Sequence, residues 1–207
     1  MLKAIIPSGG RGTRMRPLTF SANKHLIPIG NKPLIFYPIE TIAKLGIKEL
    51  AITYNPGQLG PVESLLGDGS RWGIKITYIL QPEPKGLANI FQVCEEWLAG
   101  EPFVLHLGDN IFTEGVKSLH DQFVKNKPNG LVGIVHHPEN TRLGVPFFDE
   151  DGKLVRYVEK PENPPHDFAI PGIYFFDNNV FKCFKGADAI QPSPRGEYEI
   201  SAAYQWL

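Results

Sequence analysis

LKAIIPSGGRGTR, residues 2–14, joins a short apolar run to a glycine-rich loop. An apolar run of this length that ends in glycines is typical of a buried strand in a parallel sheet. Glycines directly after such a strand let backbone N–H groups approach an anion closely, and a nest of these donors binds phosphate oxygens. The sequence therefore predicts a phosphate-binding loop after strand 2–7, with Arg14 adding positive charge; an ordinary glycine turn is the alternative.

This loop differs from two well-known glycine-rich nucleotide motifs. No Gly-Lys-Ser/Thr follows at the Walker A spacing, and Gly9, Gly10 and Gly12 lack the G-x-G-x-x-G spacing of dinucleotide-binding folds. These differences disfavour a P-loop kinase and a nicotinamide-dependent dehydrogenase.

Strand-like and helix-like runs alternate outward from this loop. Strands are predicted at 2–7, 47–54, 74–80, 103–107 and 131–135, and helices at 33–46, 60–66, 87–98 and 116–125. The first helix ends at Gly46, a residue type that commonly follows a helix C-terminus. A βαβα order predicts an α/β fold, with a mainly parallel Rossmann-like sheet flanked by helices.

The pattern changes after His137. Residues 144–148 and 153–159 flank an Asp-Glu-Asp-Gly turn and predict a hairpin, and residues 168–176 predict another strand. We expect these strands to form an antiparallel extension of the fold. Residues 198–207 have a helical pattern that stops at the chain end, and whether the native chain continues beyond Leu207 stays open.

The composition is that of an ordinary folded domain. The 207 residues, 42% hydrophobic and 21% charged, suffice for one large domain with a buried core. A net charge of −1 with mixed signs disfavours nucleic acid as a partner, and the chain lacks an apolar run long enough to span a membrane. Cys94 and Cys183 are isolated, which favours buried thiols over metal ligands. We expect a cytoplasmic protein.

Two charged side chains lie where a phosphorylated ligand would need them. Lys24, in Asn-Lys-His-Leu-Ile-Pro, follows the glycine loop closely and can neutralise phosphoryl oxygens. Asp109 follows strand 103–107, at the edge where ligands of open parallel sheets gather, and its carboxylate can hold Mg²⁺ between phosphates. The ordinary alternatives are a solvated lysine and a turn aspartate.

Residues 81–88, Gln-Pro-Glu-Pro-Lys-Gly-Leu-Ala, follow a predicted strand and open a predicted helix. The Gln81 amide offers both a donor and an acceptor, which suits the edge of a pyrimidine, and Gly86 lets backbone groups approach the base. A proline-rich loop with a helix cap is the alternative.

Together these motifs resemble the nucleotidyltransferases that act on sugar 1-phosphates, especially the long-form glucose-1-phosphate thymidylyltransferases. The family loop Gly-Gly-x-Gly-Thr-Arg is matched in full by residues 9–14, and the likeness covers nearly the whole chain. The resemblance implies transfer of a nucleotidyl group from dTTP or UTP to a sugar 1-phosphate, with Mg²⁺ as cofactor and pyrophosphate as the leaving product.

The same resemblance assigns roles to individual residues. Nucleotide binding is assigned to Ser8, Gly9, Gly10, Gly12, Thr13, Arg14, Gln81, Gly86 and Asp109. Catalysis is assigned to Arg14, Lys24 and Lys160, and the metal to Asp109. Sugar-phosphate binding is assigned to Asn110, Gly144, Glu159, Lys160, Gly172 and Tyr174. The nucleotide-binding part is thus about 1–128 and the sugar-binding part about 129–207 of one catalytic domain, while His136 and His137 are interpreted as structural.

Two departures from the family pattern bear on activity. Asn89 stands where a histidine is frequent in close relatives. The segment 195–200 (RGEYEI) usually continues with Thr-Asp, whose aspartate is a second metal carboxylate, whereas Ser201-Ala202 follows here. We therefore expect a weakened metal site, and a non-catalytic module that binds a nucleotide or sugar phosphate is the rival function. The choice between dTTP and UTP, the sugar and the formation of a homo-oligomer stay open.

Overall fold

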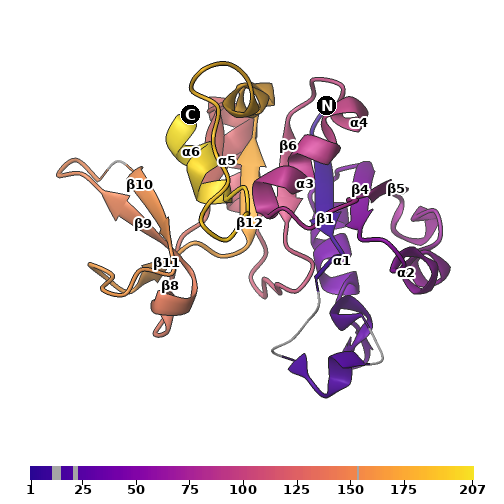
Figure 1. Cartoon of the computed structure of the whole chain (residues 1–207). Coiled ribbons are helices and arrows are strands. Elements are labelled where there is room, and N and C mark those ends of the chain that lie inside the picture. Colours follow the sequence, from indigo (N-terminus) through magenta and orange to yellow (C-terminus); the bar gives the residue numbers. More distant parts are fainter. Residues whose placement is uncertain (11–14, 21–22, 153) are drawn as a thin grey trace.

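The computed structural model describes residues 1–10, 15–20, 23–152 and 154–207 (Figure 1). Its main sheet contains, in spatial order, β5 (Lys75–Leu80), β4 (Glu49–Tyr54), β1 (Lys3–Pro7), β6 (Phe103–His106), β12 (Ile173–Phe176) and β7 (Gly130–Val132). The first four strands run parallel to one another, and β12 runs antiparallel to both β6 and β7. The predicted mainly parallel α/β fold is confirmed.

Helices cover both faces of this sheet. They are α1 (Phe36–Lys44), α2 (Leu59–Leu66), α3 (Leu87–Val93), α4 (Glu95–Leu98), α5 (Lys117–Asn126) and α6 (Ile200–Trp206). Successive strand residues point to opposite faces, so Ile6 packs with α1, α2 and α5 whereas Ile5 packs with α3, α4 and α6. Each fully buried side chain of this size contributes about 1.5–3 kcal/mol to folding. No helix in the described part of the chain is long and apolar enough to cross a membrane.

Local sequence signals explain several element ends. Gly46 has a φ of +79° directly after the last residues of α1, as expected for a glycine that follows a helix. The helix predicted over 87–98 is split into α3 and α4, because the Cys94 N–H bonds to Phe91 O, three residues back, in a tighter turn. Cys94 and Cys183 are free and buried, and burial raises the pKa of both thiols to about 12. The prediction of buried thiols is confirmed.

A short hairpin that the sequence did not predict precedes α1. It pairs β2 (Pro28–Ile29) with β3 (Lys32–Pro33) across Gly30, which has a φ of +63°. Pro33, which was expected to open the helix, therefore lies in a strand, and α1 begins at Phe36.

The antiparallel extension protrudes from the main sheet on the left of Figure 1. The predicted hairpin is present as β9 (Gly144–Phe148) and β10 (Leu154–Glu159), and β8 (Val135–His136) pairs with β11 (Phe168–Ala169). Two predictions of single strands were wrong, because 131–135 divides into β7 and β8, and 168–176 divides into β11 and β12. Pro171 separates the latter pair, since proline has no N–H for a sheet ladder.

Candidate active site

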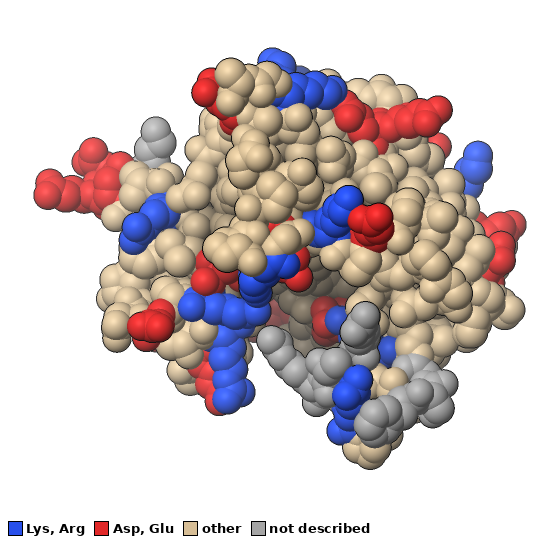
Figure 2. All heavy atoms as spheres, in the orientation of Figure 1, with Lys and Arg blue, Asp and Glu red and all other residues tan. Residues whose placement is uncertain are grey.

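The strand order reverses between β1 and β6, because β4 lies on the other side of β1. Ligands of open α/β sheets bind in the crevice outside the carboxyl ends of the two strands at such a point. A cavity of about 330 Å³ opens there, lined by Pro7 at the end of β1 and by Leu107 and Gly108 after β6. Figure 2 shows a hollow in the middle of this face, with basic and acidic side chains around it.

Eight of the described candidate residues line this cavity: Gly9, Gly10, Lys24, Gln81, Gly86, Asp109, Glu159 and Lys160. Candidates from the nucleotide-binding part and the sugar-binding part therefore face the same space. Gly12, Thr13 and Arg14 lie outside the described residues. In the described part, Ser8, Asn110, Gly144, Gly172 and Tyr174 are not lining residues.

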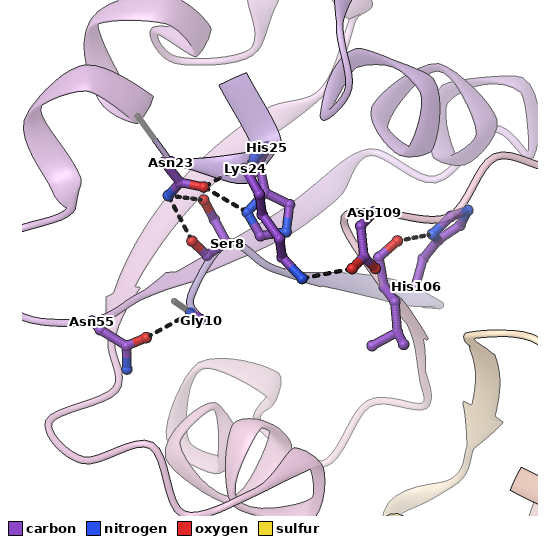
Figure 3. A network of polar contacts seen from close by, with 9 residues as sticks. Ser8, Gly10, Asn23, Lys24, His25, Asn55, His106 and Asp109 are labelled. Carbon is purple, nitrogen blue, oxygen red and sulfur yellow. Dashed lines mark hydrogen bonds and ion pairs between the residues drawn. The ribbon is translucent and has the colours of Figure 1, made fainter. Parts of the chain in front are cut away.

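Lys24 and Asp109 form an ion pair across the cavity wall (Figure 3). The Lys24 Nζ lies 2.5 Å from Asp109 Oδ2, and the two side chains are 20% and 35% exposed. Burial opposes ionisation of the Asp109 carboxyl, but the charge and hydrogen bond of Lys24 outweigh it and hold the pKa below its usual range. Asp109 is therefore a carboxylate at neutral pH.

Two buried histidines flank this ion pair without adding charge. His25 Nδ1 lies 2.8 Å from Asn23 Oδ1, and burial, assisted by the charge of Lys24, lowers the pKa of His25 to about 3. His106 Nδ1 lies 2.9 Å from Leu107 O, and burial lowers the pKa of His106 to about 4. Within the described residues His106 Nε2 has no hydrogen-bond partner. Both rings are neutral near pH 7.

The glycine loop packs against Asn55, a cavity residue that the sequence analysis missed. The Gly10 N–H donates to Asn55 Oδ1 at 3.2 Å, and a Cβ on Gly9 would lie 2.2 Å from the same oxygen. A side chain at position 9 would therefore displace Asn55. The available signal was its position, since Asn55 directly follows β4 at the edge where ligands gather.

Gly86 is constrained by the segment that precedes α6. Its φ is +93°, and an added Cβ would lie 2.6 Å from Tyr198 O. The Tyr198 N–H donates to Lys85 O at 2.7 Å, and the Ala88 N–H donates to Tyr198 O at 3.0 Å. This glycine is thus needed for close packing of two backbones beside the cavity.

Three of the sugar-side candidates, Gly144, Glu159 and Tyr174, contact Tyr157, another residue that the sequence analysis missed. The buried Tyr157 hydroxyl donates to Glu159 Oε1 at 2.7 Å and lies 3.3 Å from the Tyr174 hydroxyl. A Cβ on Gly144 would lie 2.1 Å from the Tyr157 ring. Gly144 and Tyr174 therefore contact Tyr157, which in turn contacts Glu159. Lys160, next in sequence, has a left-handed φ of +50°, a strained conformation for a residue with a side chain.

Asn110 and Gly172 meet behind Asp109. With the Asn110 amide rotated so that its oxygen faces a donor, the oxygen accepts from the Gly172 N–H at 2.9 Å and the nitrogen donates to Asp109 Oδ1 at 3.1 Å. A Cβ on Gly172 would lie 2.5 Å from Leu107 Cδ1. Both residues thus support the Asp109 carboxylate from outside the cavity.

The late segment contributes three lining residues that were not assigned roles individually: Arg195, Glu197 and Glu199. Arg195 Nη2 donates to Glu199 Oε1 at 2.7 Å, and Ser193 Oγ donates to the same oxygen at 2.9 Å. Ala202 lies on α6 and is absent from the lining within the described chain. The carboxylates nearest the cavity in this segment therefore come from positions 197 and 199.

A family model described as nucleotidyl transferase matches residues 3–207. The chain belongs to this family. A glucose-1-phosphate thymidylyltransferase of Xanthomonas campestris is 40% identical to this nucleotidyltransferase over 202 residues, which are 96% of the chain and 67% of the relative. One from Streptomyces antibioticus is 37% identical over 207 residues, 100% of the chain and 57% of the relative.

A solved structure shares the fold of this nucleotidyltransferase closely. It comes from Bacillus anthracis, is described as a candidate glucose-1-phosphate thymidylyltransferase in complex with a sucrose, and superposes with a TM-score of 0.91 at 32% identity. The match covers 100% of the present chain and 82% of that chain. The chain thus spans about 57% to 82% of the length of the proteins named here.

The cavity of this nucleotidyltransferase offers a divalent cation few protein ligands. The described residues contain no group of three or more His, Cys, Asp or Glu side chains that could hold a metal ion. Mg²⁺ is commonly bound by one or two carboxylates together with water and substrate phosphates. The ionised Asp109 fits that pattern as a single carboxylate.

Proposed function

We propose that this nucleotidyltransferase transfers a nucleotidyl group from dTTP or UTP to glucose 1-phosphate and releases pyrophosphate. The observation that carries this proposal is the meeting, in one cavity, of Lys24 and Asp109 with Gln81, Glu159 and Lys160. Lys24 suits phosphates, Asp109 suits a phosphate-bound Mg²⁺, Gln81 suits a base edge, and the last pair suits a sugar phosphate. The name glucose-1-phosphate thymidylyltransferase, which the relatives carry, supports glucose 1-phosphate and dTTP as substrates.

The reaction is an in-line displacement at the α-phosphorus of the nucleotide. A phosphate oxygen of the sugar 1-phosphate forms the new bond, the bond from the α-phosphorus to its bridging oxygen breaks, and pyrophosphate leaves with those electrons. A sugar phosphate is already ionised near neutral pH, so no general base is needed. The chain's task is to position two anions and neutralise their charge.

Individual residues divide this task. Lys160 holds the attacking phosphate, while Lys24 and Arg14 stabilise the triphosphate. Because Lys24 already pairs with Asp109 at 2.5 Å, we expect a bound triphosphate to draw its ammonium group towards the phosphoryl oxygens. Mg²⁺ held by Asp109 and the substrate phosphates would supply further charge neutralisation.

Pyrophosphate release tests this proposal. The protein is mixed with dTTP or UTP, glucose 1-phosphate and Mg²⁺, and release is compared with a mixture that lacks the sugar phosphate. Lys24→Ala should abolish most of the signal, whereas Lys117→Ala removes the same charge on the exposed surface of α5 and should keep it. Nucleotide binding without turnover in the parent would contradict the proposal.

That outcome would support the rival function, a catalytically inactive module that binds a nucleotide or a sugar phosphate. Ala202 favours the rival, since the family motif has a metal carboxylate at this position and alanine has no oxygen. The pyrophosphate assay, combined with calorimetric titration of dTTP, separates the two functions directly.

A further inference from the structure

A row of side-chain amides connects the glycine loop to α3. Asn55 Nδ2 donates to Gln81 O at 3.3 Å and to Gln81 Oε1 at 3.5 Å. Gln81 Nε2 donates to Asn89 Oδ1 at 3.0 Å, and Asn89 Nδ2 donates to Gln92 Oε1 at 3.1 Å. We call Asn55, Gln81, Asn89 and Gln92 the amide row.

The direction of the amide row is set at its first member. A side-chain amide can rotate by 180°, which exchanges its donor and its acceptor. A backbone N–H can only donate, and the Gly10 N–H points at Asn55 Oδ1 from 3.2 Å. The nitrogen of Asn55 must therefore face Gln81, and Gln81 and Asn89 then donate in the same direction, away from the glycine loop.

Burial makes this direction costly to reverse at Gln81, which is 5% exposed, and at Asn89, which is 9% exposed. A rotated Gln81 amide would place its oxygen against Asn89 Oδ1 and its nitrogen against Asn55 Nδ2. Both contacts would then join like groups, and the contact with Asn89 is buried away from water, where unmade hydrogen bonds are expensive. Only rotation of the whole row would relieve them, and Gly10 opposes that rotation.

The fixed amide still has groups to offer the cavity. Gln81 Nε2 carries a second hydrogen beyond the one given to Asn89, and Oε1 retains acceptor capacity beside its long contact with Asn55. Thymine and uracil place an N3–H donor beside the O4 acceptor, whereas cytosine places an N3 acceptor beside its amino donor. One orientation of the Gln81 amide pairs with the first pattern and repels the second.

We propose that Asn55 and Asn89 are positioning residues which hold the Gln81 amide in the orientation that selects thymine or uracil over cytosine. The proposal rests on the proposed function, in which Gln81 meets the base. It assigns a role to Asn89, and it gives a reason for the contacts that Asn55 makes with both Gly10 and Gln81. A rotating Gln81 amide would accept either pyrimidine.

Asparagine-to-aspartate substitutions at the two residues that contact Gln81 test this proposal. Aspartate can accept but not donate, so Asn89→Asp keeps the acceptor for Gln81 Nε2, whereas Asn55→Asp accepts from Gly10 and loses the donor towards Gln81. We expect Asn55→Asp to lower the ratio of kcat/KM for dTTP to that for dCTP by about tenfold or more. Asn89→Asp should keep this ratio within about threefold of the parent, because the direction of the row is retained.

Asn89→Leu tests the hydrogen bond between Gln81 and Asn89. It removes the acceptor for Gln81 Nε2, and the ratio should again fall by about tenfold, mainly through improved use of dCTP. Calorimetric dissociation constants for dTTP and dCTP are measured for each protein, so the comparison does not depend on turnover.

The outcomes separate this proposal from the proposed function. A parent that binds dTTP and dCTP equally, or variants Asn55→Asp and Asn89→Leu that keep the parental ratio, would overturn the role of the amide row. Pyrophosphate release from dTTP in the same proteins would continue to support nucleotidyl transfer. Conversely, a parent that selects dTTP in binding but releases no pyrophosphate would overturn the activity and leave the amide row supported.

Discussion

Removing one buried hydroxyl should weaken use of the sugar phosphate while sparing the nucleotide. In Tyr157→Phe the ring still packs against Gly144, and the change deletes the 2.7 Å hydrogen bond to Glu159 Oε1. Hydrogen bonds to charged groups contribute about 1.5–3 kcal/mol, and Glu159 faces an open cavity where water can replace part of the loss. We take the lower figure, which corresponds to about a tenfold fall in kcat/KM for the sugar 1-phosphate.

The assay is steady-state pyrophosphate release with each substrate varied in turn. Tyr174→Phe is the matched control, because the Tyr174 hydroxyl lies 3.3 Å from that of Tyr157 and, within the described residues, makes no hydrogen bond to Glu159. We expect Tyr174→Phe to change kcat/KM for the sugar 1-phosphate by no more than about threefold. The KM for dTTP should stay at the parental value in both variants, since the nucleotide-side lining is untouched.

Two results would refute this reasoning. An equal loss for both substrates would mean that Tyr157 supports the fold of the site rather than the position of Glu159, and urea unfolding of the variant would then show a matching loss of stability. A larger effect of Tyr174→Phe than of Tyr157→Phe would mean that Tyr174 contacts the sugar itself, the role that the sequence motif gave it.

Three further perturbations follow from the site. Lys24→Ala should lower kcat/KM by about 100-fold, as loss of a preorganised charge does, and a rate within about threefold of the parent would remove Lys24 from the reaction. The folded pKa of His106 is about 4 against 6.5 unfolded, so the unfolded chain binds the extra proton and stability falls as pH drops from 6.5 towards 4. His106→Leu should abolish about 3 kcal/mol of that fall in urea unfolding at pH 7 and pH 4, and parallel profiles would contradict this. Ala202→Asp should raise kcat by about tenfold and tighten the Mg²⁺ requirement, whereas superimposable Mg²⁺ titrations would place residue 202 away from the metal.

The local sequence pattern was sufficient to predict the elements that depend on interactions between residues close together in the chain. The apolar run before Gly9, the glycine after α1 and the Asp-Gly turn of the β9–β10 hairpin all act within a few residues. The insertion of β12 between β6 and β7 was not predictable in this way, because strand pairing is decided by tertiary packing. The apolar run at 168–176 therefore predicts a single strand, although β11 pairs with β8 and β12 lies in the main sheet.

The residues of the candidate site also differ in how far the local sequence predicts them. Lys24 and Asp109 were named because an ammonium group suits phosphates and a carboxylate suits Mg²⁺, and Lys160 was named through the family motif. Asn55 contacts Gln81, and Tyr157 contacts Glu159. The local sequence does not predict these contacts, because the fold brings the partners together. At Gly86 and Gly144 the motifs indicated that a glycine is needed, but the structure alone identifies the Tyr198 backbone and the Tyr157 ring as the groups that occupy the space.

The position of β12 also indicates that the segment carrying Glu159 and Lys160 can be exchanged as a unit. The chain leaves the main sheet after Val132 and re-enters it at Ile173, and Val132 pairs directly with Tyr174 across the ladder. The intervening forty residues, 133–172, thus begin directly after β7 and end directly before β12, which are neighbouring strands of the main sheet. Replacing this segment with that of a relative requires new contacts to α6 but no change in the spacing of its two ends. Under the proposed function, we expect a graft at these two points to change the acceptor and to keep the nucleotide preference.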